Sequence, residues 1–397
     1  MRKILKNNAV QSLIASLLCI LLGLLIGYIV LLFINPEGAW DSIVEVMKNF
    51  LHSPRPERQL RNLGSTLVRT APLLMCSLSV LFAYKVGLFN IGAAGQYVAG
   101  VCASLYAALA WHWSWLPCMI FAILAGSLLG TLVGLLKAYC NVNEVISGIM
   151  LNWIGLYTTN MILANVKEST SPYTLHLTSN APQALLPSLG SIATKIKTFF
   201  WKIFSIPGDV PGVGKFLGNQ YLTIAVPLAV IIAIIVLIVL ERTKFGYELK
   251  ATGNNKNAAK YCGMAEKRNI ILTLIISGGL AGLGGAMFYL TDLEQWSVTA
   301  TSVPGMGFNG IAATFLGGLN PIGTIFASYF IQHITDGGTN VDLTMYCAQI
   351  SDLISSIIIY LCGFVLFLKH AMNRGLARGE EARLRRASAE NAKGGEK

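Results

Sequence analysis

Long apolar runs separated by shorter polar segments form the main pattern of the chain. A helix that crosses a bilayer needs about 20 largely apolar residues, so these runs predict transmembrane helices. The first run is too long for the apolar part of a signal peptide and no small-residue cleavage site follows it, so we expect it to remain as a helix. The predicted helices cover residues 12–34, 64–85, 91–111, 115–137, 145–165, 220–240, 269–290, 304–318, 321–335 and 347–368, of which the eighth and ninth are short and interrupted by Gly or Pro.

Composition favours a membrane protein over a soluble one. Of the 397 residues, 54% are hydrophobic and only 12% are charged, whereas an average soluble domain has about 25% charged residues. The net charge of +11 is also typical of nucleic-acid-binding proteins, but here the cations lie at the ends of apolar runs. We therefore expect the lipid bilayer, and no nucleic acid, to surround the chain.

Lysine and arginine orient the predicted helices, because cytoplasmic loops of membrane proteins carry an excess of them. Three lie before the first apolar run, seven lie in 242–268 and eight follow from Lys369 onward. Alternating ten helices from a cytoplasmic N-terminus places all three groups in the cytoplasm. We predict cytoplasmic termini, a transmembrane domain over 1–368 with an external loop at 166–219, and a cytoplasmic tail over 369–397.

Two shorter patterns lie outside the predicted spans. Residues 39–52 place apolar and polar side chains on opposite sides at helical spacing. This predicts a helix that lies at the outer surface of the bilayer or packs on the helical bundle. The external loop is rich in Ser, Thr, Pro and Gly, and we expect a short helix near 192–204 within it.

The cytoplasmic segment 241–268 is longer than a simple connection needs. Gly253 is typical of a helix end, Asn254 or Asn255 can cap a following helix, and Gly263 can end that second helix. Two short helices joined by a tight turn are therefore predicted. The residues that we expect this turn to present to the cytoplasm are Ala258, Ala259 and Tyr261.

The sequence contains no catalytic or metal-binding pattern. The eight cysteines form no C-x-x-C pair and the five histidines no H-x-x-x-H pair, so no metal site is expected. Residues 208–216 differ from a phosphate-binding loop in glycine spacing and in having Phe where Ser or Thr would hold Mg²⁺. Charged residues within the spans are scarce, and Arg69, Glu144 and Asp352 lie near helix ends. This argues against an ion-coupled carrier and suits a neutral solute.

Two glycine-rich breaks open predicted helices, the third at Phe89–Gln96 and the eighth at Gly305–Ala313. Discontinuous helices can point backbone N–H groups and amide side chains into a membrane cavity. The residues that we predict to line such a pathway are Phe89, Asn90, Gly92, Gly95, Gln96, Phe308 and Asn309. Other glycines recur at spacings of four and are predicted to pack helices closely: Gly23/Gly27, Gly126/Gly130/Gly134 and Gly278/Gly282. In this topology the second to fifth helices and the seventh to tenth are inverted repeats.

Three segments resemble the permease subunits of ATP-binding-cassette (ABC) importers for simple sugars, branched-chain amino acids and nucleosides. The closest resemblance is to the longer subunit of the nucleoside, purine-lipoprotein-linked group. Gly87–Gln96 reads GLFNIGAAGQ and is similar to that subunit's GLFNIGAEGQ, with Ala94 in place of Glu. Residues 242–263 resemble its cytoplasmic coupling segment. Residues 307–323 resemble its late glycine-rich motif, although Ala313-Thr314 replace an aliphatic pair.

The resemblance implies an all-α membrane fold related to the vitamin B12-type importers, in a bacterial cell membrane. It implies a second homologous permease, a cytoplasmic subunit that binds ATP and Mg²⁺, and a lipoprotein or periplasmic substrate-binding protein. This chain would be no enzyme and hold no cofactor. ATPase coupling would involve Gly246, Gly253, Asn254, Ala258, Ala259, Tyr261 and Gly263. Nucleosides are the expected solutes; a sugar or branched-chain amino-acid permease, or a stand-alone secondary carrier, is the alternative.

Overall fold

The computed structural model describes residues 8–53, 55–189 and 222–341, and isolated residues between 344 and 374. In these residues the chain is helical, with only isolated β-bridges between loops. The longer helices are α2 (Asn8–Ile34), α3 (Ala39–Lys48), α4 (Pro56–Lys85), α5 (Ala93–Leu109), α6 (Trp115–Cys140), α7 (Glu144–Leu163), α11 (Ala225–Arg242), α12 (Lys244–Asn254), α14 (Glu266–Tyr289), α15 (Met306–Leu316) and α16 (Pro321–Gly337). Short helices are α8 (Leu177–Asn180) and α13 (Lys256–Tyr261).

Helices form at the first nine predicted spans, and the two short ones become α15 and α16. Four are long and apolar enough to cross a membrane by length and composition, within α4, α6, α11 and α14. Only isolated residues of the predicted span 347–368 are described, and the helix expected near 192–204 and the stretch 208–216 lie outside the described residues. The apolar runs therefore predicted the helices, but the ten-helix total stays a prediction.

Helix ends follow from local side-chain chemistry. The Asn143 side chain accepts a hydrogen bond from the Val145 N–H, 2.9 Å away, at the start of α7. Asn320 caps α16 in the same way through Ile322, with Pro321 at the first helical position. Such caps satisfy N–H groups that a helix start leaves unpaired. They explain why polar side chains directly precede apolar runs.

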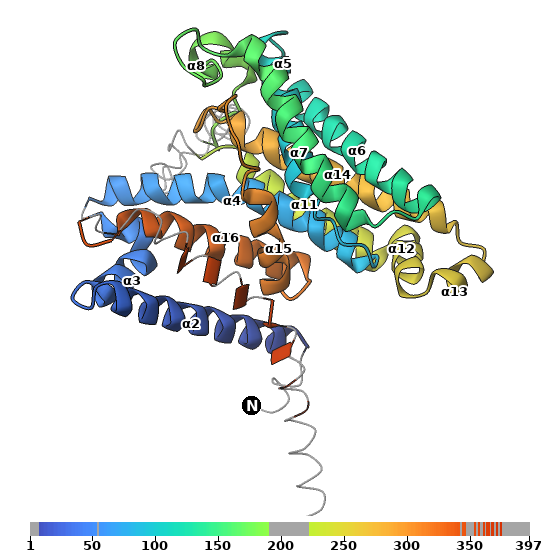
Figure 1. Ribbon diagram of the computed structural model, residues 1–397, viewed down its shortest axis with the longest axis horizontal. Helices are drawn as coiled ribbons and strands as arrows, with labels where there is room; N and C mark the ends of the chain where they lie inside the picture. Colours follow the sequence, from blue (N-terminus) through green and yellow to red (C-terminus); the bar gives the residue numbers. More distant parts are fainter. Residues whose placement is uncertain are drawn as a thin grey trace, which may run out of the picture.

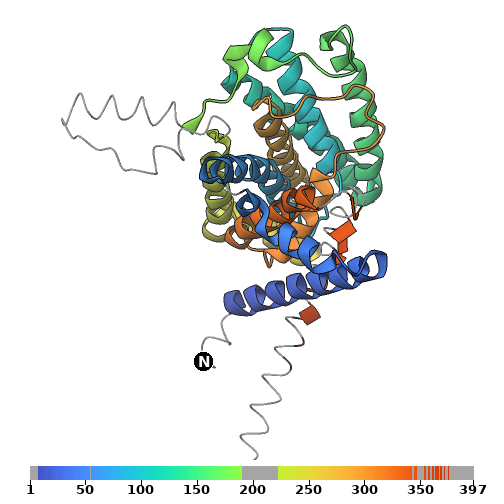
Figure 2. The same ribbon diagram turned by 90° about the vertical axis from the view of Figure 1, so that its left-hand side faces the viewer.

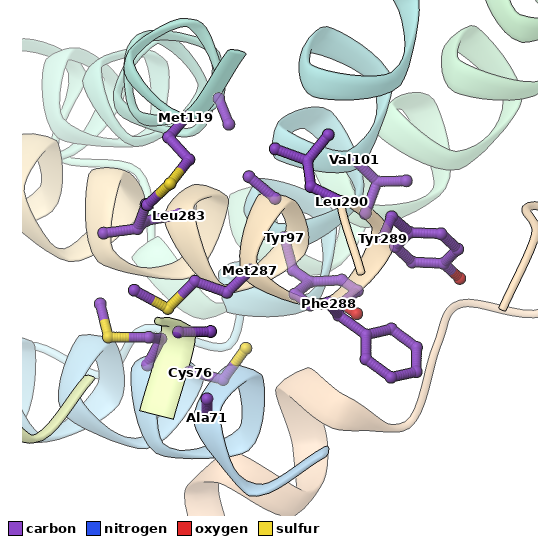
Figure 3. Close-up of a cluster of buried hydrophobic side chains, with 14 of the residues drawn as sticks. Ala71, Cys76, Tyr97, Val101, Met119, Leu283, Met287, Phe288, Tyr289 and Leu290 are labelled. Carbon is purple, nitrogen blue, oxygen red and sulfur yellow. The ribbon is translucent and has the colours of Figure 1, made fainter. Parts of the chain in front are cut away.

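The bundle is built from two groups of helices that pack across each other. α4 packs against α15 and α16 of the later group, while α14 packs against α5 and α6 of the earlier one. Figure 3 shows side chains from α4, α5, α6 and α14 meeting in the core. Among them are Cys76, Tyr97, Met119, Leu283 and Met287, all buried. α4 and α14 therefore form the centre of the molecule (Figure 1).

Glycines allow α6 and α14 to touch at the backbone. A Cβ atom at Gly126 would overlap the carbonyl oxygen of Gly278, and one at Gly130 would overlap that of Leu274. A Cβ at Gly282 would reach the carbonyl of Ala122, and Gly134 lies against Ile271. Small residues permit this approach in membranes, where van der Waals packing drives helix association. The packing role predicted for these glycines is confirmed.

The helix predicted at 39–52 packs on the bundle. Val46 is buried, and its carbonyl meets α16 at Gly337, where a Cβ would overlap it. The Asn49 side chain donates to Thr66 and lies 3.1 Å from His333 Nδ1. The structure therefore shows the second of the two predicted arrangements, packing on the helical bundle. Trp40, Met47 and Leu51 remain exposed.

Opposite ends of the bundle carry different segments. α12 and α13 project at one end, and α3 and α8 lie toward the other (Figure 1). α2 lies along one side of the bundle (Figure 2). The loop after α14 pairs with the loop before α8 through a bridge between Tyr173 and Ser297. The Asp292 carboxylate accepts the N–H groups of Leu177 and Thr178 at the start of α8. Sequence analysis did not predict this short helix.

Candidate translocation and coupling site

The segment predicted to couple the chain to an ATPase folds as two short helices, α12 and α13. Thr243 caps α12 through the Gly246 N–H, at 3.0 Å, and Asn255 caps α13 through the Ala258 N–H, also at 3.0 Å. α12 runs one residue beyond Gly253, to Asn254. Of the two asparagines considered as caps, Asn255 is the one that acts.

Gly263 ends α13 in a left-handed conformation, with φ +79°. The Gly263 N–H donates to the Lys260 carbonyl, and the Met264 N–H donates to the Ala259 carbonyl. This is the Schellman arrangement, for which glycine is favoured because it has no Cβ. The predicted helix end at Gly263 is confirmed.

α13 is exposed on one side only. Ala258 and Asn254 are exposed, and Tyr261 is 93% exposed. Ala259, however, is only 3% exposed. Its predicted presentation to the cytoplasm is therefore wrong. The turn at Gly263 folds the chain back, and Ala259 lies on the side of α13 that faces the protein.

α12 is fixed to the bundle at both ends. At its start, a Cβ on Gly246 would overlap the Val239 carbonyl of α11. At its end, Gly253 lies against the backbone of Val86 and Gly87, which follow α4. Between these contacts Leu249 is buried, and the Thr252 hydroxyl accepts a 2.8 Å hydrogen bond from Asn269 of α14. A displacement of α12 therefore acts on both central helices.

The first break leads from this contact into a buried hydrogen-bond node. Asn90 is 2% exposed, and its Nδ2 lies 3.1 Å from Ser79 Oγ, 2.7 Å from Ser277 Oγ and 2.8 Å from Gln96 Oε1. The Ser277 hydroxyl also donates to the Ser79 carbonyl. The node joins α4, α5 and α14. Sequence reasoning missed both serines, which are common in membrane helices and carry no distinctive spacing.

The glycines of the first break bring α7 against α5. Gly92 faces Gly148 of α7, while a Cβ on Gly95 would come within 2.6 Å of the Cα of Asn152. The Asn152 side chain accepts the Gly95 N–H at 2.7 Å and donates to the Ile91 carbonyl at 3.1 Å. It thereby satisfies backbone groups that the break leaves without helical partners. An amide within an apolar run was the available sequence signal for Asn152.

The second break packs directly on the first. Gly307 meets Ala94 so closely that a Cβ would come within 2.5 Å of the Ala94 Cα, and Gly310 meets Cys76 of α4. Phe308, which follows Gly307, is exposed, and Asn309 is partly exposed. The structure therefore brings the two breaks into contact, but the predicted pathway residues of the first break differ in exposure from those of the second. Asn90 and Gln96 are buried, whereas Phe308 is exposed and Asn309 partly exposed.

A group of charges surrounds Arg69, which lies near the middle of α4 (Pro56–Lys85) and not near a helix end as predicted. Arg69 is 3.3 Å from Glu294, in the loop after α14, and 3.8 Å from Asp336 at the end of α16. Gln332 also donates to Asp336 at 2.9 Å. In the last turn of α6, Lys137 pairs with Glu144, the first residue of α7, at 2.7 Å. Asp352 lies outside the described residues. Each charge inside the described spans thus has a partner, as the low polarity of a membrane requires.

In the described part of the chain, no group of three or more His, Cys, Asp and Glu side chains gathers where a metal ion could be held. The candidate site has three parts that follow one another in space: the exposed short helix α13, the anchored helix α12 and the buried hydrogen-bond node at Asn90.

We expect Asn90→Ala to lower stability, because it leaves the Gln96 carbonyl oxygen without a donor and removes the bonds to both serines. Unsatisfied buried polar groups cost about 1–3 kcal/mol each. Thermal unfolding of the purified protein in detergent should show a lower Tm, whereas Asn165→Ala, at an exposed local hydrogen bond, should not. An unchanged Tm for Asn90→Ala would show that the node carries no stability.

Helical composition and apolar spans make the chain a multi-pass membrane protein of the permease class. Residues 62–363 match the family described as branched-chain amino acid transport system / permease component, and the chain belongs to this family. This confirms the family resemblance drawn from the three motifs.

Individual relatives extend the match over nearly the whole chain. The nucleoside ABC transporter permease protein NupB of Lactococcus lactis is 28% identical over 368 residues, 89% of this chain and 91% of its own. The guanosine ABC transporter permease protein NupP of Bacillus subtilis is 30% identical, over 88% of this chain and 92% of its own. The L. lactis nucleoside permease NupC is 27% identical over 67% of this chain. No solved structure matches.

Proposed function

We propose that this chain is the translocation subunit of an ATP-driven ABC importer for nucleosides. The observation that carries the proposal is the divided coupling segment, in which α13 is exposed while α12 is anchored to α4, α11 and α14. A stand-alone carrier has no need of such a docking element. Two relatives that match along about nine-tenths of the chain are named for nucleoside or guanosine transport. These names favour nucleosides over sugars or amino acids.

The arrangement of charge supports a cytoplasmic position for α13. Lys85, Lys137, Lys260 and Arg268 all lie at or near the end of the bundle that carries α12 and α13. An excess of cations marks cytoplasmic loops. With this orientation both termini are cytoplasmic and α8 is external. The reciprocal packing of α4 and α14 is in keeping with two inverted repeats and with the B12-importer type of fold.

The partners follow from the same proposal. A second, shorter permease would complete the pathway, because L. lactis has both NupB and NupC and this chain aligns along more of its length with NupB. A cytoplasmic ATP-binding subunit would dock on α13 and hydrolyse ATP with Mg²⁺. A lipoprotein or periplasmic binding protein would deliver the solute to the external end.

The mechanism transmits movement through backbone contacts. Closure of the ATP-binding subunits displaces α13, and α12 carries the displacement to the Gly87 turn and to Asn269. From Gly87 it reaches the node at Asn90, which holds α4 and α14 together. A shift between these central helices changes access at the two breaks. Neutral amides and backbone groups there suit an uncharged nucleoside better than an anion.

Ala258→Arg tests the docking surface. Because Ala258 is exposed, a bulky cation there should leave folding and membrane insertion intact. It should lower ATP-dependent guanosine uptake by proteoliposomes that contain the full transporter at least tenfold, which corresponds to about 1.4 kcal/mol of lost binding energy. ATPase activity stimulated by the binding protein should fall in parallel.

The matched control is Lys267→Ala, an exposed position outside α13. It should keep near-normal uptake. Normal guanosine uptake by Ala258→Arg would refute α13 as the docking element. Wild-type uptake that persists without ATP and without the ATP-binding subunit would refute the importer class. Uptake of glucose but no nucleoside would refute the proposed solute.

A further inference from the structure

The outward face of α7 carries polar aromatic side chains halfway along a predicted span. Trp153 and Tyr157 are 43% and 58% exposed, and their rings stack with centroids 6.2 Å apart at 25°. Thr158, the next residue, is also exposed. α7 has 20 residues starting at Glu144, about 30 Å at 1.5 Å per residue, so Trp153 lies near the middle of the helix.

Other exposed helix faces of this molecule have a different composition. The exposed side of α6 is aliphatic at Leu124, Leu128 and Leu132, with Tyr139 near its end. The exposed side of α11 is made of isoleucines: Ile231, Ile234, Ile235 and Ile238. Tryptophan and tyrosine usually occupy the two membrane–water interfaces, where their polar groups reach water. α6 and α11 are therefore typical lipid-facing helices, and the middle of α7 is not.

Three polar groups on the exposed side of α7 have no hydrogen-bond partner among the residues that the structure describes. The Trp153 N–H, the Tyr157 hydroxyl and the Thr158 hydroxyl make no hydrogen bond to any described residue. Such groups are costly against hydrocarbon, which offers no acceptor or donor. A polar occupant on this face removes that cost.

The aromatic pair is attached to the first break. Asn152, directly before Trp153, binds the Gly95 N–H and the Ile91 carbonyl. Ile91 and Gly95 follow the Gly87 turn, which contacts Gly253 of α12. The position of Trp153 is thus coupled to the segment that we propose to move with ATP.

We propose that Trp153 and Tyr157 form a stacking platform for the base of the transported nucleoside, with the Thr158 hydroxyl available to its ribose. The inference rests on the proposed nucleoside function. A planar base stacks on aromatic rings whatever its identity, and its polar edges and sugar supply the partners that lipid lacks. The solute contact sites would then be on α7, beside the break, while Asn90 and Gln96 hold the break together.

The test uses the complete transporter, with both permeases, the ATP-binding subunit and the binding protein, in proteoliposomes. Initial rates of ATP-dependent uptake are measured for radiolabelled guanosine and cytidine. Trp153→Leu should lower guanosine uptake at least about fivefold, the smaller effect expected from the loss of one base–aromatic stack. Cytidine uptake should fall less, because a pyrimidine has less ring area to stack. Trp153→Phe should stay within about twofold of the wild type, since an aromatic face remains.

Leu128→Ala on α6 is the control for loss of an exposed apolar side chain, and the shorter permease co-purified with each variant reports assembly. Wild-type rates for Trp153→Leu would overturn the platform while leaving the importer proposal intact. An equal fall for both nucleosides, or a loss of co-purified permease with normal uptake per complex, would also overturn it. A wild-type transporter that takes up no nucleoside would instead refute the proposed function.

Discussion

Gly130→Val is expected to prevent accumulation of folded protein. A Cβ at Gly130 would overlap the carbonyl oxygen of Leu274, which belongs to the backbone of α14 and has no rotamer to change. The helices would have to separate, and with them the adjoining contacts of Gly126 with Gly278. Overpacking that forces backbone shifts typically costs about 1–3 kcal/mol and occasionally more, and here it acts on backbone at two neighbouring contacts. Fluorescence-detected size-exclusion chromatography of the tagged protein should show little monodisperse material.

Leu128→Val is the matched control, because it places the same residue on the exposed side of the same helix. It should elute like the wild type, which separates the clash from the lower helix propensity of valine. Gly130→Ala should give an intermediate yield, since it introduces a single methyl group. A monodisperse peak of wild-type height for Gly130→Val would show that the two helices do not depend on this contact.

Hydropathy predicted much of the fold because the bilayer imposes a length and a polarity on each spanning helix. The same constraint makes small residues at spacings of four on an apolar helix a sign of close packing. Gly126 and Gly278 were therefore predicted as packing residues from spacing alone, and their contact confirms it. Physical rules that act within one helix were sufficient for these features.

Rules that act within one helix do not predict contacts between segments that are distant in the chain. An asparagine in a glycine-rich break has the same local pattern whether it faces a pathway or a buried partner. Asn90 meets Ser277, 187 residues later in the chain, and no local rule identifies that partner. The pathway role predicted for Asn90 stays a prediction, while its structural role is visible.

The error at Ala259 has a different origin. The sequence predicts that Ala258, Ala259 and Tyr261 all face the cytoplasm. The Schellman turn returns the chain so that the Met264 N–H reaches the Ala259 carbonyl, and one side of α13 is covered. The helix ends were predicted correctly, but the side of α13 that faces the protein depends on where α14 begins.

Gly253 connects the predicted coupling segment to the predicted pathway. Its backbone lies against Val86 and Gly87, and Gly87 has φ +76°, a conformation that favours glycine. Two residues further on begins the break with Phe89 and Asn90. The coupling segment and the first break are far apart in the chain but are in direct contact in the folded protein, through Gly253 and Gly87. Because of this contact, a substitution at Gly253 is the most direct way to separate ATP-driven movement of α12 from solute access at the first break.

Gly253→Val is accordingly expected to uncouple the transporter. Its side chain would overlap the Val86 carbonyl and lift the end of α12 away from the Gly87 turn. The exposed side of α13 would remain available, so ATP hydrolysis by the assembled complex should persist. Guanosine uptake in proteoliposomes should fall at least about a hundredfold, which corresponds to about 2.8 kcal/mol of lost coupling at 1.4 kcal/mol per tenfold change.

Lys244→Val, at the exposed start of the same helix, is the control and should retain both activities. Assembly is checked by co-purification of the ATP-binding subunit with each variant. If Gly253→Val lost ATP hydrolysis and uptake together, α12 would be part of the docking surface. If it retained normal uptake, movement would reach the bundle by another contact, and the hydrogen bond between Thr252 and Asn269 would be the next to remove. Only hydrolysis without uptake places the transmission step between Gly253 and Gly87.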